Sequence, residues 1–336
     1  MWESHKKLCH IFVTSDCYLE RISRKSSAVL AILAPGQGAQ TPGFLAPWLA
    51  DDAVRAELQT LSDVAQVDLA HYGTDADADT IRQTDIAQPL LVAAGLVAAA
   101  ALLDDGPRPD VVAGHSVGEI TAAALTGVLS PSDAMAFVAT RARGMAAASN
   151  ARPTSMMAVI GGVPDEVLAA IEAAGLTAAN NNGPGQIVAA GTVEQLGVLA
   201  ANPPARARLI QLSVAGAFHT VHMHPAVAAL ETLAATLTPS HPTTWLLSNS
   251  DGAVVDSGAE FLSRLVSQVG NPVRWDLCLG TLAELGVTGI LELPPSGTLT
   301  GIAKRNLKGV ALFNLNTPDQ LADAKAFVAE HAGAAA

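Results

Sequence analysis

The chain has 336 residues, which is enough for one large domain or for a large and a small one. Half of the residues are hydrophobic and 15% are charged, so a sizeable core can be buried, and because only 4% are aromatic that core must consist mainly of Ala, Val and Leu. The 31 acidic and 19 basic residues give a formal net charge of −12, which argues against a general nucleic-acid-binding surface.

Cysteine usage and hydropathy favour a cytoplasmic location. The three cysteines show neither metal-ligand spacing nor a disulfide framework, so we expect no metal site and a reducing compartment. The longest apolar run, Leu90 to Leu103, is shorter than the roughly 20 residues that a membrane span needs. We therefore expect a buried helix there and no membrane association.

The N-terminal residues 1–27 differ in texture from the rest, because they contain Cys9 and Cys17 and show no periodicity. We interpret them as an extension outside the fold. The apolar run Ala28–Ala34 then predicts a buried strand, which leads into the turn Pro35-Gly36-Gln37-Gly38-Ala39-Gln40. The turn lacks the Lys-Ser/Thr ending of a P-loop and the third glycine of a dinucleotide-binding motif. It is either a plain strand-to-helix turn or a loop that offers backbone N–H groups to an oxyanion.

The next stretch contains a candidate nucleophile. The pattern predicts an amphipathic helix over 51–71, a polar loop and helix start over 74–85, an apolar helix over 90–103 and a strand over 110–114. This strand breaks at Gly114-His115-Ser116-Val117-Gly118 and continues into a helix over 120–125. The motif is the G-x-S-x-G nucleophile elbow in its required strand–turn–helix context, with Ser116 as the nucleophile.

A second long helix is predicted from the N-cap Ser130 to about residue 147, and it carries Arg141 and Arg143. By residue type alone, these arginines are either solvated side chains of a surface helix or parts of a site.

The predicted order of strands and helices changes over 152–215. The predicted order there is β-α-β-β-α-β, the ferredoxin-like unit, with strands at 156–160, 176–179, 186–190 and 207–214 and helices at 164–174 and 193–201. We expect a small domain inserted into a larger one that comprises 28–151 and 216–331.

The remainder alternates again between helices and strands. The predicted helices are 225–237, 261–268, 277–285 and 319–331, and the predicted strands are 243–248, 289–293 and 311–316. Alternation of this kind favours the α/β class with a mainly parallel sheet.

A serine nucleophile needs a general base. His219 follows the apolar pair Ala217-Phe218 and is better placed than its neighbours His222 and His224 to be held by packing. His115 is expected to point away from Ser116, because consecutive side chains at the elbow diverge. Neither Asp133 nor Asp165, which lie between Ser116 and His219, makes a convincing third member of a triad, so a carbonyl group is an alternative means of orienting the base.

Taken together, six motifs resemble the malonyl-CoA:acyl carrier protein transacylases and the acyltransferase domains of polyketide synthases. The resemblance extends from about residue 28 to about residue 330. It rests on Pro35–Gln40, Gly114–Glu119, Arg141, Asn182-Gly183-Pro184-Gly185-Gln186, Gly216-Ala217-Phe218-His219 and Gln268–Val273.

This resemblance implies a hydrolase-like large domain with the ferredoxin-like unit as a lid, and it implies a role for each motif. Ser116 would be acylated, His219 would be its base, and the main-chain carbonyl of Gln268 would orient the imidazole. The N–H groups of Gln37 and Val117 would form the oxyanion hole. Arg141 would pair with the malonyl carboxylate, with further substrate contacts from Phe218, Asn182 and His115.

The implied reaction moves a malonyl group from malonyl-CoA, a coenzyme A thioester, to the phosphopantetheine thiol of acyl carrier protein. It requires no bound cofactor and no metal. Ala217-Phe218 before the histidine matches the malonyl-selective version of the family's motif, so the resemblance implies malonyl rather than methylmalonyl. Since carrier proteins are acidic, a basic patch should guide docking, and the candidates are Lys304, Arg305, Lys308, Arg206 and Arg208. A monomer is expected.

Two other functions stay open at this point. One is a serine hydrolase of the patatin-like type that uses Ser116 with Asp251 of Asp251-Gly252-Ala253, although that sequence is also an ordinary turn. The other is a non-enzymatic module that binds carrier proteins.

Overall fold

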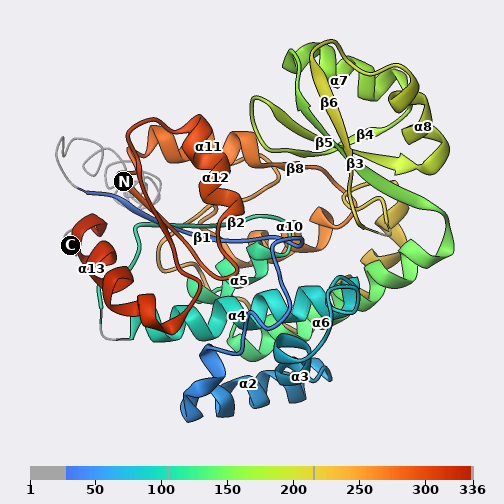
Figure 1. Cartoon of the computed structure of the whole chain (residues 1–336). Coiled ribbons are helices and arrows are strands. Elements are labelled where there is room, and N and C mark those ends of the chain that lie inside the picture. The colour runs from blue at the N-terminus through green and yellow to red at the C-terminus, as the bar shows by residue number, and fades with distance from the viewer. Residues whose placement is uncertain (1–27, 105, 215, 334–336) are drawn as a thin grey trace, which may run out of the picture.

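The computed structural model describes residues 28–104, 106–214 and 216–333. The predicted extension 1–27 lies outside these described residues. Two sheets organise the chain, and each has five strands. Figure 1 shows the second sheet standing apart from the first, together with its own two helices α7 and α8.

The first sheet is parallel and has the order β10-β9-β1-β2-β7. Its central strand β1 is fully buried, as its continuous apolar sequence predicts for a sheet that is covered on both faces. The register pairs Ala34 with Gly114, so β1 and β2 end side by side. The strands are β1 (Leu30–Ala34), β2 (Val111–Gly114), β7 (Trp245–Leu246), β9 (Gly289–Glu292) and β10 (Ala311–Asn314).

Alternate residues of β1 face two layers of helices. Leu30 and Ile32 pack into a core with α4 (Thr84–Leu103), α5 (Gly118–Leu125), α6 (Pro131–Ala151), α10 (Gly258–Gln268) and α13 (Leu321–His331). Ala31 and Leu33 pack into a second core with α11 (Trp275–Glu284) and α12 (Thr298–Asn306). The α/β class with a mainly parallel sheet is thereby confirmed.

The apolar helix α4 begins at Thr84, within the helix start predicted over 74–85, and continues through Pro89. A proline near the start of a helix removes a single backbone hydrogen bond, and here the buried packing of the helix outweighs that loss. Within the described residues, α4 is long and apolar enough to cross a membrane, but 89% of its apolar window is buried inside the protein. It is a core helix.

The second sheet has the order β6-β3-β5-β4-β8, and its first four strands are antiparallel to their neighbours. The predicted β-α-β-β-α-β unit is confirmed, with β3 (Thr154–Gly161), α7 (Pro164–Ala173), β4 (Thr177–Asn181), β5 (Gln186–Thr192), α8 (Val193–Ala201) and β6 (Ala207–Gln211). One strand was not predicted. The two-residue β8 (Val273–Arg274) comes from the C-terminal half and pairs parallel with β4.

Three predicted elements need correction. The helix expected over 51–71 is interrupted, because Gln66 adopts a left-handed conformation (φ 57°) that ends α2 (Asp52–Ala65), and Asp68 then caps α3 (Leu69–Thr74). The strand expected over 243–248 shrinks to β7. The helix expected from 225 becomes the 3-10 turn η2 (Val221–Ala226), which contains Pro225, followed by α9 (Val227–Ala234).

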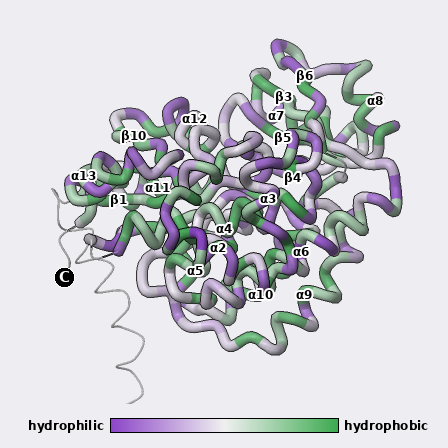
Figure 2. Tube along the Cα trace, turned by 60° about the horizontal axis from the view of Figure 1, so that its bottom comes forward, coloured by the Kyte–Doolittle hydropathy of each residue, from purple (hydrophilic) through white to green (hydrophobic). Residues whose placement is uncertain are grey.

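Two further short 3-10 turns complete the chain, η1 (Trp48–Ala50) and η3 (Pro318–Gln320). Figure 2 shows hydrophobic and hydrophilic segments alternating along outer helices such as α8 and α9. Of α9 only Leu230 is buried, and of α8 only Leu196 and Leu199, which is the one-sided burial of surface helices.

Candidate active site

The nucleophile motif forms a sharp turn between β2 and α5. A Cβ atom on Gly114 would lie 2.0 Å from the carbonyl carbon of Gly118, and one on Gly118 would lie 2.2 Å from the carbonyl oxygen of Ala34. Only glycine fits at either position. Between them, Ser116 has a φ of 53°, a left-handed backbone conformation that residues other than glycine rarely adopt. The structure therefore places Ser116 on a strained elbow at the carboxyl end of the parallel sheet.

His219 lies directly against this serine. Its Nε2 is 2.7 Å from Ser116 Oγ, and its Nδ1 is 2.8 Å from the main-chain carbonyl oxygen of Gln268. A carbonyl oxygen only accepts hydrogen bonds, so Nδ1 carries the proton and Nε2 is left to accept from the serine hydroxyl. The geometry is that of a nucleophile, a base and a group that orients the base, with a carbonyl in the place of the acid.

The imidazole is neutral in this setting. His219 is 2% exposed. Burial lowers the pKa of His219 to about 3, and the positive charge of Arg141 acts in the same direction. A neutral imidazole is the form that can take a proton from serine at physiological pH.

Arg141 approaches the serine from α6 and is 1% exposed. Its guanidinium donates to Gln88 Oε1 at 2.7 Å, to Gln268 Oε1 at 2.8 Å and to Ser116 Oγ at 3.3 Å. Burial lowers the pKa of Arg141 to about 10, and nearby Glu119 opposes that shift, so the group remains charged at neutral pH.

All three acceptors of Arg141 are neutral, and within the described ranges no salt bridge is formed by this side chain. The alternative of a solvated arginine is therefore excluded for Arg141. Arg143 is exposed and matches that alternative.

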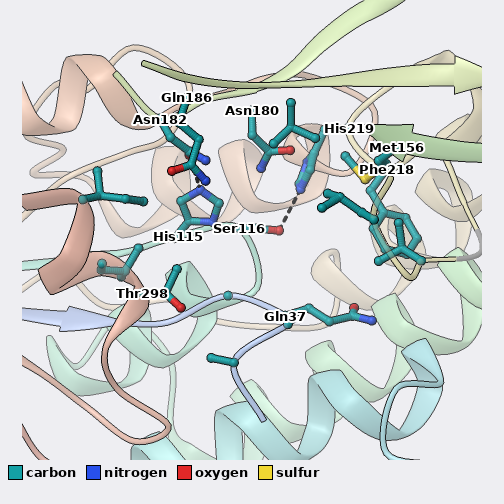
Figure 3. A pocket seen from close by; sticks show the side chains of 18 of the residues that line it. Gln37, His115, Ser116, Met156, Asn180, Asn182, Gln186, Phe218, His219 and Thr298 are labelled. Atoms are coloured by element: carbon teal, nitrogen blue, oxygen red, sulfur yellow. Dashed lines mark hydrogen bonds between the residues drawn. The ribbon is translucent and has the colours of Figure 1, made fainter. Parts of the chain in front are cut away.

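A pocket of about 260 Å³ opens over Ser116 between the two sheets. Figure 3 shows Ser116 and His219 facing this pocket, with Gln37 below them and Asn180, Asn182 and Phe218 on the other sides. Further lining comes from Gly36, Gly38, Ala39, Gln88, Met145, Met156, Gln186, Val188, Leu212, Val214, Thr298, Leu299 and Ile302.

His115 and Ser116 line the same pocket, but their side chains bond to different groups there. Ser116 Oγ contacts His219 and Arg141, and the expected divergence of the two side chains stays a prediction. His115 Nε2 donates to Asn182 Oδ1 at 2.8 Å, and this bond links the elbow to the segment after β4. Burial lowers the pKa of His115, while the bond to Asn182 opposes the shift.

The glycine-rich turn after β1 reaches the same pocket with Gln37. Val117 follows the serine at the start of α5, where backbone N–H groups point out of the helix end. The assignment of these two N–H groups to an oxyanion stays a prediction.

Several predicted residues lie away from Ser116. Arg305 donates to Gln186 Oε1 at 2.9 Å, which places it at the rim of the pocket. Lys304, Lys308, Arg206 and Arg208 are exposed, and none of them lines the pocket. Asp251 pairs with Arg264 at 2.7 Å and also lies outside the pocket, which argues against its use with Ser116 in a hydrolase.

Sequence reasoning missed four groups around the site. These are Glu119, Asn249, Gln88 and the side-chain amide of Gln268, all of them buried. Asn249 accepts from Ser116 N and donates to Gly114 O, both at 2.8 Å, and so braces the elbow. The only signal in the sequence was Glu119 itself, a charged residue at the start of an apolar helix.

No group of three or more His, Cys, Asp or Glu side chains that could hold a metal ion occurs in the described part of the chain.

Comparison with known proteins assigns the family. The family described as "Acyl transferase domain" matches residues 33–326. The chain is 48% identical, over 296 residues, to the Malonyl CoA-acyl carrier protein transacylase of Mycobacterium tuberculosis, which covers 87% of this chain and 98% of that protein.

Two solved structures are similar throughout. The crystal structure of MCAT from Mycobacterium tuberculosis has a TM-score of 0.84 and 47% identity, covering 88% of this chain and 99% of that one. A malonyl-transacylase solved in complex with a type II PKS acyl-carrier protein has a TM-score of 0.83 and 28% identity, covering 89% and 99%. The resemblance indicated by the six motifs is confirmed, and the chain belongs to the acyl transferase domain family.

Proposed function

We propose that this protein is an [acyl-carrier-protein] S-malonyltransferase, which moves a malonyl group from malonyl-CoA to the phosphopantetheine thiol of acyl carrier protein through a malonyl ester on Ser116. One observation carries the proposal. A single atom, Ser116 Oγ, lies 2.7 Å from the base His219 and 3.3 Å from the buried cation Arg141. A nucleophile beside an unpaired buried cation suits an acyl group that brings its own carboxylate.

The selectivity follows from the charge of Arg141. A planar guanidinium can hold a carboxylate through two parallel hydrogen bonds, which a lysine cannot reproduce. A malonyl carboxylate would give this cation its missing counter-charge. An acetyl group would leave it unpaired, and a buried unpaired charge costs several kcal/mol. Phe218, Asn182 and His115 are proposed to complete the acyl and pantetheine contacts, because all three line the pocket.

The first half-reaction loads the enzyme. Ser116 Oγ attacks the thioester carbonyl of malonyl-CoA while His219 Nε2 takes the hydroxyl proton. The N–H groups of Gln37 and Val117 are proposed to hold the oxyanion, and one such donor typically contributes about 3 kcal/mol. The carbon–sulfur bond then breaks, and the leaving sulfur of coenzyme A receives the proton from His219.

The second half-reaction reverses these roles. The phosphopantetheine thiol gives its proton to His219 and attacks the ester carbonyl. When the ester bond breaks, Ser116 Oγ recovers the proton, and the malonyl group leaves as a thioester. Water competes with the thiol at this stage, so a narrow pocket between the two units favours transfer over hydrolysis. We propose 28–151 with 216–331 as the catalytic domain and 152–215 as the inserted lid.

Docking of the carrier protein needs positive charge on a chain whose net charge is −12. We assign this role to two exposed clusters, one formed by Lys304, Arg305 and Lys308 and the other by Arg206 and Arg208. Support comes from the bond between Arg305 and the pocket residue Gln186. The related transacylase in complex with an acyl-carrier protein also supports such a partner. A cytoplasmic monomer completes the proposal.

Intact-mass measurement after mixing the protein with malonyl-CoA, acetyl-CoA or methylmalonyl-CoA tests this function. We expect one malonyl adduct on the wild type, little adduct from the other two thioesters, and none on Ser116→Ala. Absence of a covalent adduct on the wild type would instead favour a non-enzymatic binding module.

A further inference from the structure

Glu119 is a buried carboxyl group that the proposed reaction does not use. It is 1% exposed and lies on the first turn of α5. Its Oε1 accepts from the backbone N–H of Asn249 at 2.6 Å, and its Oε2 contacts Nε2 of Gln268. Both oxygens therefore accept from N–H donors, which is what an ionised carboxylate offers. Burial raises the pKa of Glu119 to about 8, and the bonds from Asn249 and Gln268 and the charge of Arg141 oppose the shift. The ionised form is therefore assigned from the two donors that face its oxygens, because a protonated oxygen beside Gln268 Nε2 would set two donors against each other.

The side-chain amide of Gln268 connects this carboxylate to the cation. Its Nε2 donates to Ser116 O at 3.0 Å as well as to Glu119, and its Oε1 accepts from Arg141 at 2.8 Å. The amide can satisfy these partners in one orientation only, with the NH₂ toward Glu119 and the oxygen toward Arg141. A reversed amide would direct an N–H donor at a guanidinium that has no acceptor to offer.

We propose that Glu119 is a positioning residue which, through the side-chain amide of Gln268, holds the guanidinium of Arg141 in place to receive the acyl carboxylate. It thereby contributes to the choice of malonyl over neutral acyl groups. The inference rests on the proposed function, because it assumes that Arg141 pairs with the acyl carboxylate.

Replacement of Glu119 by glutamine is expected to disturb this set of hydrogen bonds. Glutamine has one acceptor and two N–H donors at its amide. If its oxygen keeps the bond from Asn249, its NH₂ group meets the NH₂ group of Gln268. The amide of Gln268 then loses a partner or reverses. A reversed amide takes Oε1 away from Arg141, and an amide without its bond to Glu119 holds Oε1 less firmly. In both cases Arg141 keeps its bond to Gln88 but is less well fixed beside Ser116.

A purely structural role for Glu119 predicts a different result. Asn249 links Glu119 to the elbow, because the Asn249 side chain binds Ser116 N and Gly114 O. If Glu119 only supported the elbow, its loss would impair the nucleophile for every acyl group. Malonyl and acetyl transfer would then fall by the same factor.

The experiment compares the rates of Ser116 acylation by malonyl-CoA and by acetyl-CoA, measured by quenched-flow intact mass. Wild type, Glu119→Gln, Gln268→Ala and the double variant are compared. Gln268→Ala removes the amide but keeps the main-chain carbonyl that accepts from His219. We expect the malonyl-to-acetyl ratio to fall about tenfold or more in each single variant, the size expected for loss of a hydrogen bond to a charged group.

The double variant tests the connection itself. If Glu119 acts through Gln268, the double variant loses no more of the ratio than Gln268→Ala does alone. Glu119→Asp, which keeps the charge on a shorter side chain, should retain part of the ratio, and this variant carries the test if Glu119→Gln does not fold. An unchanged ratio in Glu119→Gln, or additive effects in the double variant, would overturn the inference.

Glu292 provides the matched control. It is another fully buried carboxyl group, and it accepts from the backbone N–H groups of Gly297, Leu299 and Thr300. Among the described residues, none of these bonds involves Ser116, His219, Arg141 or Gln268. Glu292→Gln should lower stability and leave the ratio unchanged. A fall in the ratio equal to that of Glu119→Gln would attribute the effect to lost stability and overturn the inference.

Arg141→Ala separates the inference from the proposed function. If Arg141→Ala keeps the wild-type ratio, the assignment of Arg141 to the acyl carboxylate is wrong and the inference falls with it. If Arg141→Ala loses the ratio while Glu119→Gln keeps it, the proposed function stands and only the role of Glu119 is wrong.

Discussion

The guanidinium of Arg141 lies 3.3 Å from the hydroxyl oxygen of Ser116, although all of α5, a loop and the first half of α6 separate the two residues in the chain. A permanently charged group is thus held within reach of any acyl group that Ser116 carries. The arrangement makes the charge of the acyl group, and not only its size, a determinant of which thioester reacts.

Loss of this charge should remove the preference for malonyl. We expect Arg141→Ala to lower the rate of malonyl loading by about 100-fold or more, because the acyl carboxylate then enters a buried pocket without a counter-ion. Acetyl loading should fall much less. Arg141→Lys should recover only part of the malonyl rate, since an ammonium group lacks the planar pair of donors. Arg143→Ala, on the same helix but exposed, is the control and should stay close to wild type.

A pair of variants tests whether His219, or instead Asp251 of the patatin-like alternative, acts with Ser116. His219→Ala should lower malonyl transfer by about 10² to 10⁴-fold, the usual contribution of a general base. Asp251→Ala removes an ion pair with Arg264 that is partly exposed, so it should change transfer little. Loss of activity in Asp251→Ala with retention in His219→Ala would support the patatin-like hydrolase instead.

The depressed pKa of His219 has a consequence for the pH profile. Only the neutral imidazole accepts the proton of Ser116, and its pKa is about 3 instead of the usual 6.5. The acylation rate should therefore show no decline as the pH falls through 6.5, and the loss due to protonation of His219 should begin only toward pH 4. Single-turnover loading at a series of pH values measures this. An inflection at 6.5 that persists in a variant at His222, the neighbouring histidine, would contradict the account.

The elbow should tolerate no side chain at its second glycine. A methyl group on Gly118 would meet the backbone oxygen of Ala34 at 2.2 Å, and neither backbone can move without disturbing the sheet. We expect Gly118→Ala to lower the free energy of unfolding by about 3 kcal/mol or more. Apart from its chain neighbours and the backbone of its own helix, Gly301 in α12 has no atom within 4 Å of the position that a Cβ would take. Gly301→Ala should therefore raise that free energy by about 0.5–1 kcal/mol. Urea denaturation of both variants checks the pair.

Much of the fold was predictable because its signals are local. Apolar runs that end in glycine turns indicated β1 and β2, and the β-α-β-β-α-β order indicated the second sheet. β8 was not predictable, since two residues after Asn271-Pro272 form a strand only because the edge of β4 is available in space. The sequence predicted a single helix in place of α2 and α3 for a similar reason, because nothing in it marks the left-handed conformation of Gln66.

Site residues were predictable where a sequence motif specifies them. They were less predictable where tertiary packing determines which side chain is buried in the site. Arg141 and Arg143 are two positions apart on one helix, so they point to nearly opposite sides, and only the packing of α6 determines which one is buried. The bond from His115 to Asn182 joins residues 67 positions apart, so no local pattern predicts it. Glu119, Gln88 and Asn249 reach the site through tertiary contacts, and no periodicity in the sequence signals those contacts.

The central claim is that the malonyl group passes through Ser116 to a carrier-protein thiol. Malonyl-enzyme freed of coenzyme A should be mixed with phosphopantetheinylated acyl carrier protein, and the intact masses of both proteins should be followed over time. We predict that the malonyl group disappears from the enzyme and appears on the carrier protein at the same rate and in equal amount, and that carrier protein without its phosphopantetheine arm gains nothing. Release of the group to water at an unchanged rate, with no gain on the carrier protein, would contradict the account.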